Sequence, residues 1–305
     1  MRVTALAQQQ FALDQIKKLQ TRMADQNISI TSGVTSQRYS GVAEESKRLV
    51  NLEATHTQLS RFVQNNTIVD QRLQTMETNV SQLGEIASEI RTQLVSALNS
   101  GNAPVSGIDV LAQNLLDQVS SILNVSFDGR FLFSGSMTNT APVDLNDPMF
   151  VVPPSVYPST PDLNYYQGDQ QILSVRADTD LTVDYGVTAA DPAIEKLVRT
   201  LHLVSTAITS PVPDTARLQE ALSVAEEAAN EIPLVVSKIG AARKSLETAN
   251  SVHNETILYT EQTIGDLQNT DLAKAITLLS ADQSSLEASF ATLAQMRSIS
   301  LLNYL

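Results

Sequence analysis

The chain has 305 residues, enough for two or three compact domains or for one extended domain. It contains no cysteine, which excludes disulfides and thiolate metal sites, and its formal net charge of -13 argues against nucleic acid and anionic membranes as partners. Without a run of 18 apolar residues, or an apolar stretch in residues 1–20, we expect neither a transmembrane helix nor a cleavable secretory signal.

The first 32 residues are predicted to form one helix. Their apolar side chains recur every three or four residues, which is the spacing of a stripe that packs against a partner helix. Gly33 follows, and glycine readily takes the left-handed conformation that ends a helix. The polar residues 34–41 are predicted to form a linker. The side chains expected to contact a partner are Leu6, Leu13, Ile16 and Met23.

A long helix is predicted over residues 42–99 and a shorter one over residues 108–123. In the long helix, apolar positions from Leu59 to Ala97 alternate in steps of three and four without slippage. Asn66 alone interrupts them, and a single buried asparagine can define the register of paired helices at some cost in stability.

Residues 128–191 differ in composition from the rest of the chain. They contain no lysine or glutamate, and seven of the 11 prolines fall between positions 142 and 192. We expect a small inserted β module with an irregular loop over 138–161 and a hairpin turn over 177–180. The predicted strands cover residues 130–134, 150–152, 172–176 and 181–185.

Helix returns at Asp191, a capping residue followed by proline at the first helical position. This helix is predicted to end near residue 209, and a second long helix to cover residues 214–268. Pro233 lies inside the second long helix and predicts a kink. Because the two long helices have nearly equal lengths, we expect them to lie side by side.

The last predicted helix, residues 271–305, organises the rest of the chain. Asp271 is a favourable N-cap, and neither proline nor glycine interrupts the apolar stripe. The apolar character continues to the final residue, although chain ends are usually polar, so we expect this end to be buried by other molecules. The interface residues expected here are Leu272, Ile276, Leu279, Leu286, Phe290, Leu293, Leu301, Leu302, Tyr304 and Leu305.

The order of these elements predicts a mainly α fold: an elongated, nested coiled-coil or helical-bundle rod with a small inserted β module at its far tip. Residues 1–41 and 269–305 would form a terminal helix pair, 42–127 and 192–268 a long-helix bundle, and 128–191 a small β-rich inserted domain. The terminal pair has no third partner within the chain, and a pair of thin helices is only marginally stable. We therefore expect self-assembly, in which neighbouring copies complete the core.

No catalytic, cofactor-binding or metal-binding residues are predicted. His56, His202 and His253 are far apart, and none has a second ligand four residues away. Asp178 and Asp180 suggest a calcium loop, but the glycine and closing glutamate of such a loop are absent. A solvated turn is the better interpretation, and we expect a protein that is not an enzyme.

Short motifs along the whole chain stand at the spacing of one known family. They are residues 30–33 (ITSG), 129–136 (GRFLFSGS), 166–169 (YQGD), 239–243 (IGAAR), 271–276 (DLAKAI), 286–289 (LEAS) and 300–305 (SLLNYL). In these motifs the chain resembles the bacterial flagellin superfamily, and most closely its hook-associated protein 3 members. The chain departs from the family at residues 39–45, where an Asp-Asp-Pro turn is usual.

The resemblance implies a structural subunit of the extracellular bacterial flagellum, forming the junction between hook and filament. It implies export through the flagellar channel without a cleaved signal peptide. It also implies a ring or tube of further copies of the chain, in which residues 1–41 and 269–305 form the inner assembly domain. The other implied partners are a neighbouring hook-associated protein, flagellin and a flagellar export chaperone, without nucleic acid or membrane. Three alternatives stay open: a flagellin of the filament, a coiled-coil scaffold, and a surface binding module formed by residues 128–191.

Overall fold

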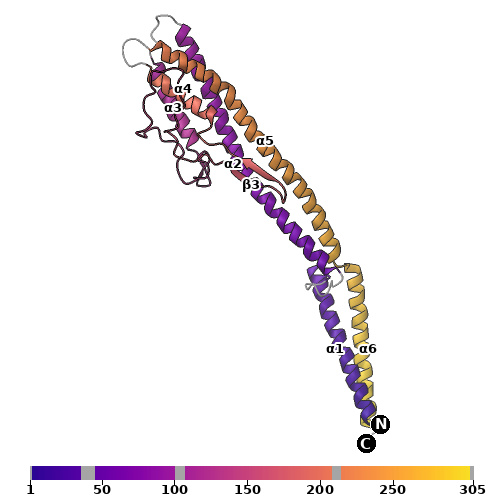
Figure 1. The fold of residues 1–305 in the computed structure, drawn as a ribbon. Coiled ribbons are helices and arrows are strands. Elements are labelled where there is room, and N and C mark those ends of the chain that lie inside the picture. The colour runs from indigo at the N-terminus through magenta and orange to yellow at the C-terminus, as the bar shows by residue number, and fades with distance from the viewer. Residues whose placement is uncertain (1, 36–44, 100–106, 208–213, 303–305) are drawn as a thin grey trace. The chain divides into compact units, whose positions relative to one another are not determined.

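The computed structural model describes residues 2–35, 45–99, 107–207 and 214–302. These residues are mainly helical with two small antiparallel sheets, as predicted (Figure 1). The helices are α1 (Arg2–Ser32), α2 (Ser46–Asn99), α3 (Ile108–Leu123), α4 (Pro192–Ser205), α5 (Thr215–Gln268) and α6 (Leu272–Leu302). The strands are β1 (Ser126–Phe127), β2 (Arg130–Phe131), β3 (Leu173–Arg176) and β4 (Thr182–Tyr185).

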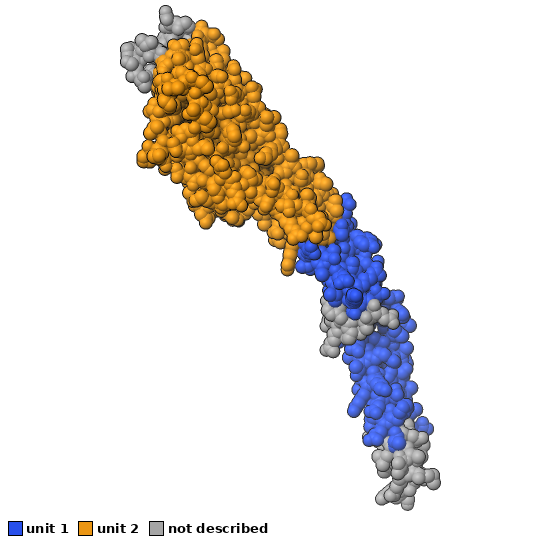
Figure 2. Space-filling model, in the orientation of Figure 1, with its two compact units in different colours: residues 1–58, 255–305 blue, residues 59–254 orange. Residues whose placement is uncertain are grey.

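The described residues divide into two compact units, coloured separately in Figure 2. Unit 1 comprises residues 1–58 and 255–305, and unit 2 comprises residues 59–254. The helices α2 and α5 contribute to both units, and all four strands belong to unit 2. The three-part division expected from the sequence stays a prediction. Most of the predicted 34–41 linker and the unusual turn at 39–45 lie outside the described residues.

The core of unit 2 follows the predicted register of the long helices. On α2, the side chains at the predicted seam are buried from Val69 to Leu94. On α5, Leu218, Ile232 and Leu246 are buried against them, and the helix continues through Pro233. Charge pairs flank this core: Arg243 donates through Nε to Asp70 Oδ1 (2.9 Å) and through Nη1 to Glu77 Oε2 (2.6 Å).

Asn66 is buried, as its place in the apolar stripe predicted. Its Nδ2 donates to Asn250 Oδ1 (2.9 Å) on α5 and to the carbonyl of Ala177 (3.0 Å), which follows β3. The same carbonyl lies 2.9 Å from Nε2 of His253, which is also buried. The β3–β4 hairpin is therefore held against α2 and α5, and the expectation of a β module at the tip of the rod is wrong for this hairpin. The polar groups of the two helices provide the hydrogen bonds that hold it there.

The hairpin itself forms as predicted, with Leu173 opposite Tyr185 and Arg176 opposite Thr182. The first predicted strand is shorter than expected: β2 ends at Phe131 and pairs with β1 across a turn at Asp128 and Gly129, both with positive φ.

Two motifs that are distant in the sequence, residues 129–136 and 166–169, meet directly after this sheet. The backbone N–H of Ser136 donates to Asp169 Oδ1 (2.8 Å), and the N–H of Asp169 donates to the carbonyl of Ser134 (3.2 Å). Gly135 has φ +69, and a Cβ there would lie 2.2 Å from Asp169 Oδ1, so only glycine fits. Hydrogen bonds from Ser136 lower the pKa of Asp169, which keeps its carboxylate charged.

The segment 150–152 does not form the predicted strand. Two prolines follow it directly, and proline cannot donate the backbone hydrogen bond that a sheet requires. Instead, the Phe150 ring packs 5.7 Å from that of Tyr165 and 4.2 Å from that of His202 on α4. This loop thus covers the α3–α4 pair without becoming part of a sheet.

Candidate assembly interface

The helices α1 and α6 lie side by side and antiparallel in unit 1, and Figure 1 marks both chain ends at the same end of the pair. At the other end, the N–H of Thr270 donates to Gly33 O (2.9 Å) and the N–H of Thr35 to Gln268 O (2.7 Å). Gly33 ends α1 with φ +75, as predicted. Asp271 caps α6, because its Oδ1 accepts a hydrogen bond from the backbone N–H three residues on (3.0 Å). Backbone hydrogen bonds between distant segments therefore hold the two helices together where the chain enters and leaves them, and local sequence defines the helix ends.

The contact stripe between the two helices is narrow. The buried side chains in it are Ile16 on α1 and Ala275, Asp282 and Leu293 on α6. Half-buried side chains continue the stripe in steps of three and four; they are Leu19, Met23, Gln26 and Ile30 on α1 and Leu279, Leu286 and Ser289 on α6. Few apolar groups leave water here, so the pair gains less from burial than the core of unit 2.

A charged residue occupies the middle of this stripe. Arg22 donates through Nε to Asp282 Oδ2 (2.6 Å) and through Nη2 to Asp282 Oδ1, so the two side chains form a bidentate ion pair. Asp282 is 8% exposed and Arg22 is 61% exposed in their side chains. The hydrogen bond from Arg22 lowers the pKa of Asp282, and a hydrogen bond from Gln26 lowers it further. The contact therefore fixes the register of α6 against α1 by charge and geometry together.

The structure separates the predicted interface residues into groups. Ile16 and Leu293 are buried within the α1–α6 pair, and Met23, Leu279 and Leu286 are half-buried in it. Leu13, Leu272, Ile276 and Phe290 are exposed, at 39%, 49%, 53% and 47%. The side chains of Leu6, Leu301 and Leu302, and the residues Tyr304 and Leu305, lie outside what the structure describes.

The side of α6 that meets α1 is therefore offset by one residue from the predicted seam at about half of the described positions, and the role of that seam in assembly stays a prediction. The contact stripe runs through Ala275, Asp282 and Ser289 where the predicted seam ran through Ile276, Gln283 and Phe290. Adjacent residues on a helix are about 100° apart, so one step turns an apolar side chain out of the contact. The sequence feature that indicates this offset is the pair of opposite charges at Arg22 and Asp282. The spacing of apolar residues contains no information about such a charge pair.

Unit 1 consequently carries a large number of exposed apolar side chains. Among its described residues they are Phe11, Leu13, Ile28, Val50, Leu258, Tyr259, Leu272, Ile276, Leu278 and Phe290. Phe11, Ile28 and Leu278 were not predicted, because they fall outside the seam that was expected. Apolar side chains gathered at this density on one unit are typical of surfaces that other proteins cover.

The three histidines have separate structural contacts. His56 Nε2 lies 3.0 Å from Glu261 Oε1, and His253 stacks on Phe62 with ring centroids 5.6 Å apart. His202 packs on Phe150, and burial lowers its pKa. Within the described ranges, the acidic and imidazole side chains form no cluster that could hold a metal ion. No helix in that same part of the chain is both long and apolar enough to cross a membrane.

These features define a helical structural protein whose first and last helices pair with each other and leave apolar side chains exposed, among them the row Leu272, Ile276 and Phe290 on α6. We call these exposed side chains of α1 and α6 the open apolar face. The family model of the bacterial flagellin N-terminal helical region matches residues 3–138. The model of the bacterial flagellin C-terminal helical region matches residues 222–305. The chain belongs to the bacterial flagellin family and is a structural protein of the extracellular bacterial flagellum, not an enzyme.

Individual relatives agree with this assignment. The chain is 22% identical over 268 residues to flagellar hook-associated protein 3 of Escherichia coli strain K12, covering 83% of each chain. It is similar in fold to a putative flagellar hook-associated protein from Vibrio parahaemolyticus, with a TM-score of 0.60 and 19% identity over 73% of this chain and 97% of that one. The flagellar junction protein FlgL from Legionella pneumophila has a TM-score of 0.51 at 16% identity, over 74% of this chain and 99% of that one.

Proposed function

We propose that this chain is the subunit that joins hook and filament in the flagellum. The observation that carries the proposal is the agreement between the open apolar face of α1 and α6 and the relatives described as hook-associated or junction proteins. A junction must match two different neighbours, one on the hook side and one on the filament side.

The open face gives this proposal its mechanism. Copies of the chain assemble into a ring or tube, in which α1 and α6 of one copy cover the apolar side chains of the next. Phe290, Ile276 and Leu272 on α6 then leave water. Because each is only about half exposed in the isolated chain, its burial stabilises the assembly by about 1 kcal/mol, roughly half the value for a fully exposed side chain. A neighbouring hook-associated protein and flagellin are the proposed partners at the two rims. A flagellar export chaperone is a further proposed partner, which would cover the same face before secretion.

A strain that lacks this protein tests the junction role. We expect hooks in normal number, no attached filaments, and flagellin monomers in the culture medium, because exported flagellin finds no rim on which to assemble. The measurement combines hook counts by electron microscopy with flagellin in the supernatant. The same strain carrying the intact gene is the control.

A filament subunit is the second candidate, because both matched family models describe the terminal helical regions of flagellin itself. The same strain distinguishes the two. Filaments that stay attached but are shorter or altered in shape would reject the junction role and favour one flagellin among several.

A further inference from the structure

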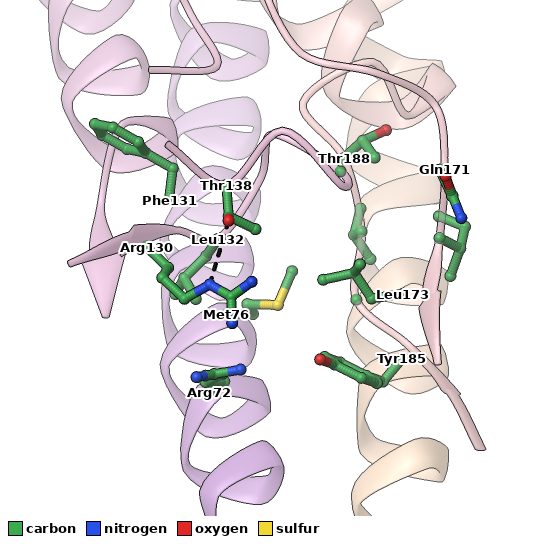
Figure 3. A pocket seen from close by; sticks show the side chains of 14 residues that line it. Arg72, Met76, Arg130, Phe131, Leu132, Thr138, Gln171, Leu173, Tyr185 and Thr188 are labelled. Carbon is green, nitrogen blue, oxygen red and sulfur yellow. Dashed lines mark hydrogen bonds between the residues drawn. The ribbon is translucent and has the colours of Figure 1, made fainter. Parts of the chain in front are cut away.

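A small pocket in unit 2 is lined by two arginines and by no carboxylate (Figure 3). Its volume is about 80 Å³, which is the room of two or three water molecules at ~30 Å³ each. The lining comes from α2, from β2 and the residues after it, and from the β3–β4 hairpin. In a chain of net charge -13, a concave site with only positive charge is unexpected.

The first arginine, Arg72 on α2, has no ion pair with any described residue. Its Nε is fully buried and without a hydrogen-bond partner in the described part of the chain. The nearby carboxylates on α2, Asp70 and Glu77, both bind Arg243 of α5 instead. The Arg72 guanidinium is therefore neutralised by no carboxylate of the described residues, and its terminal nitrogens are the groups that an anion in the pocket contacts.

The second arginine, Arg130 on β2, donates through Nε to Thr138 Oγ1 (3.2 Å). This contact orients the guanidinium and leaves its two terminal nitrogens for another acceptor. Figure 3 shows the guanidinium groups of Arg130 and Arg72 on the side of the pocket opposite Tyr185, whose hydroxyl points toward them. Two like charges facing one small volume repel each other; water screens part of this repulsion because Arg130 is exposed, and an anion bound between the two guanidinium groups offsets the rest.

The remaining lining is largely apolar. Met76 and Leu173 contribute aliphatic surface, and Tyr185 contributes a ring with one hydroxyl. An apolar wall favours an anion that has a short hydrocarbon part over a fully hydrated one. The planar guanidinium group of an arginine can donate two parallel hydrogen bonds to the two oxygens of a carboxylate.

We propose that this pocket binds a carboxylate group carried on a short aliphatic stem, held by Arg72 and Arg130. Two sources have this chemistry: a free small organic acid, and an acidic side chain of a second copy of the chain. The proposal does not depend on the position of the protein in the flagellum.

The methyl group of Met76 provides a direct probe. The chain has six methionines, so a protein labelled with ¹³C at the methionine methyls gives a simple spectrum. The full chain is titrated with propionate, with inorganic phosphate and with chloride at equal ionic strength. We expect a saturable shift of the Met76 signal with propionate, and a weaker response to the other two anions. A protein dilution series without propionate then separates the two sources, because a carboxylate from a second copy shifts Met76 with protein concentration.

Arg72→Gln and Arg130→Gln should each weaken propionate binding at least tenfold. If Arg130→Gln does not fold, Arg130→Lys takes its place. Lysine keeps the positive charge but cannot donate two parallel hydrogen bonds to a carboxylate, so this variant should show an intermediate loss of propionate affinity. Arg61→Gln, an exposed arginine on the same helix, is the matched control and should bind as the parent does. Absence of a saturable response to both propionate and dilution, equal binding by Arg72→Gln, or tighter binding of phosphate than of propionate would each overturn the proposal.

Discussion

Asp282 is the single residue that most constrains how α6 lies on α1. The Asp282 carboxylate accepts two hydrogen bonds from the Arg22 guanidinium, and this contact lowers the pKa of Asp282. Because the folded pKa lies below the unfolded one, the contact stabilises the pair above the usual aspartate range. That contribution disappears as the pH falls through the lowered pKa.

Asp282→Asn should therefore loosen the α1–α6 pair at neutral pH while changing little at strongly acidic pH. The measurement is amide hydrogen exchange of α1 and α6, corrected for the intrinsic pH dependence of exchange. Asp14→Asn on the exposed side of α1 is the control. A variant that exchanges like the parent at neutral pH would show that the ion pair does not hold the helices.

Arg217 holds the proline-rich loop onto α5. It is 6% exposed, and its Nη2 donates to the carbonyl of Pro153 (2.9 Å) and to Ser155 Oγ (2.9 Å). Its Nη1 donates to Thr206 Oγ1 (2.9 Å), which follows α4.

Arg217→Met should lower the free energy of unfolding by about 2–4 kcal/mol, since it leaves several acceptors without a donor. Urea unfolding measures this loss, with exposed Lys238→Met on the same helix as the control. Equal stability of the two variants would mean that water replaces the arginine without cost.

At the scale of elements, residues 138–165 differ from their sequence-based interpretation. The composition of residues 138–161 predicts an irregular loop, but Thr138 and Val143 within it, and Tyr165 shortly after it, are buried. The Tyr165 hydroxyl donates to the carbonyl of Ala189 (2.8 Å), directly before α4. Deletion of the whole segment should therefore destabilise unit 2.

Substitutions within this segment should separate its anchored and exposed parts. Tyr165→Ala should cost about 3–5 kcal/mol, because a large aromatic side chain leaves a cavity in the core. Val152→Ser, at an exposed position of the same segment, should change stability by no more than about 0.5 kcal/mol. Thermal unfolding of the two variants compares them, and similar losses would contradict this division.

At the scale of the whole molecule, assembly and folding should be separable. Phe290 is exposed on α6, whereas Leu286 is half-buried against α1. Phe290→Asp should leave the isolated chain folded but prevent incorporation into the flagellum, since an unpaired carboxylate buried in the assembly costs several kcal/mol. Leu286→Asp should weaken the α1–α6 pair as well.

Motility and the amount of protein retained in purified flagella measure this effect. Leu234→Asp is the control, because Leu234 is also apolar and exposed (67%, against 47% for Phe290) but lies in unit 2. Normal incorporation of Phe290→Asp would show that this face of α6 is not an assembly surface.

The sequence by itself determined the helices, most of their ends and the core register of α2 and α5. Those features depend on local helix propensity, on capping residues such as Asp191 and Asp271, and on apolar periodicity. Each of these depends on residues that are close together in the sequence. It also contained the motifs that identify the flagellin family.

Tertiary structure alone decided which face of α6 meets α1, because the choice depends on Arg22, 260 positions away from Asp282. It also decided where the β3–β4 hairpin lies, since the carbonyl of Ala177 is held by Asn66 and His253 from two distant helices. Tertiary structure likewise brings Arg72 and Arg130, which are far apart in the sequence, to the wall of one pocket. Each of these features joins side chains that no periodicity connects, and only the packed chain brings their charges and hydrogen-bonding groups within reach.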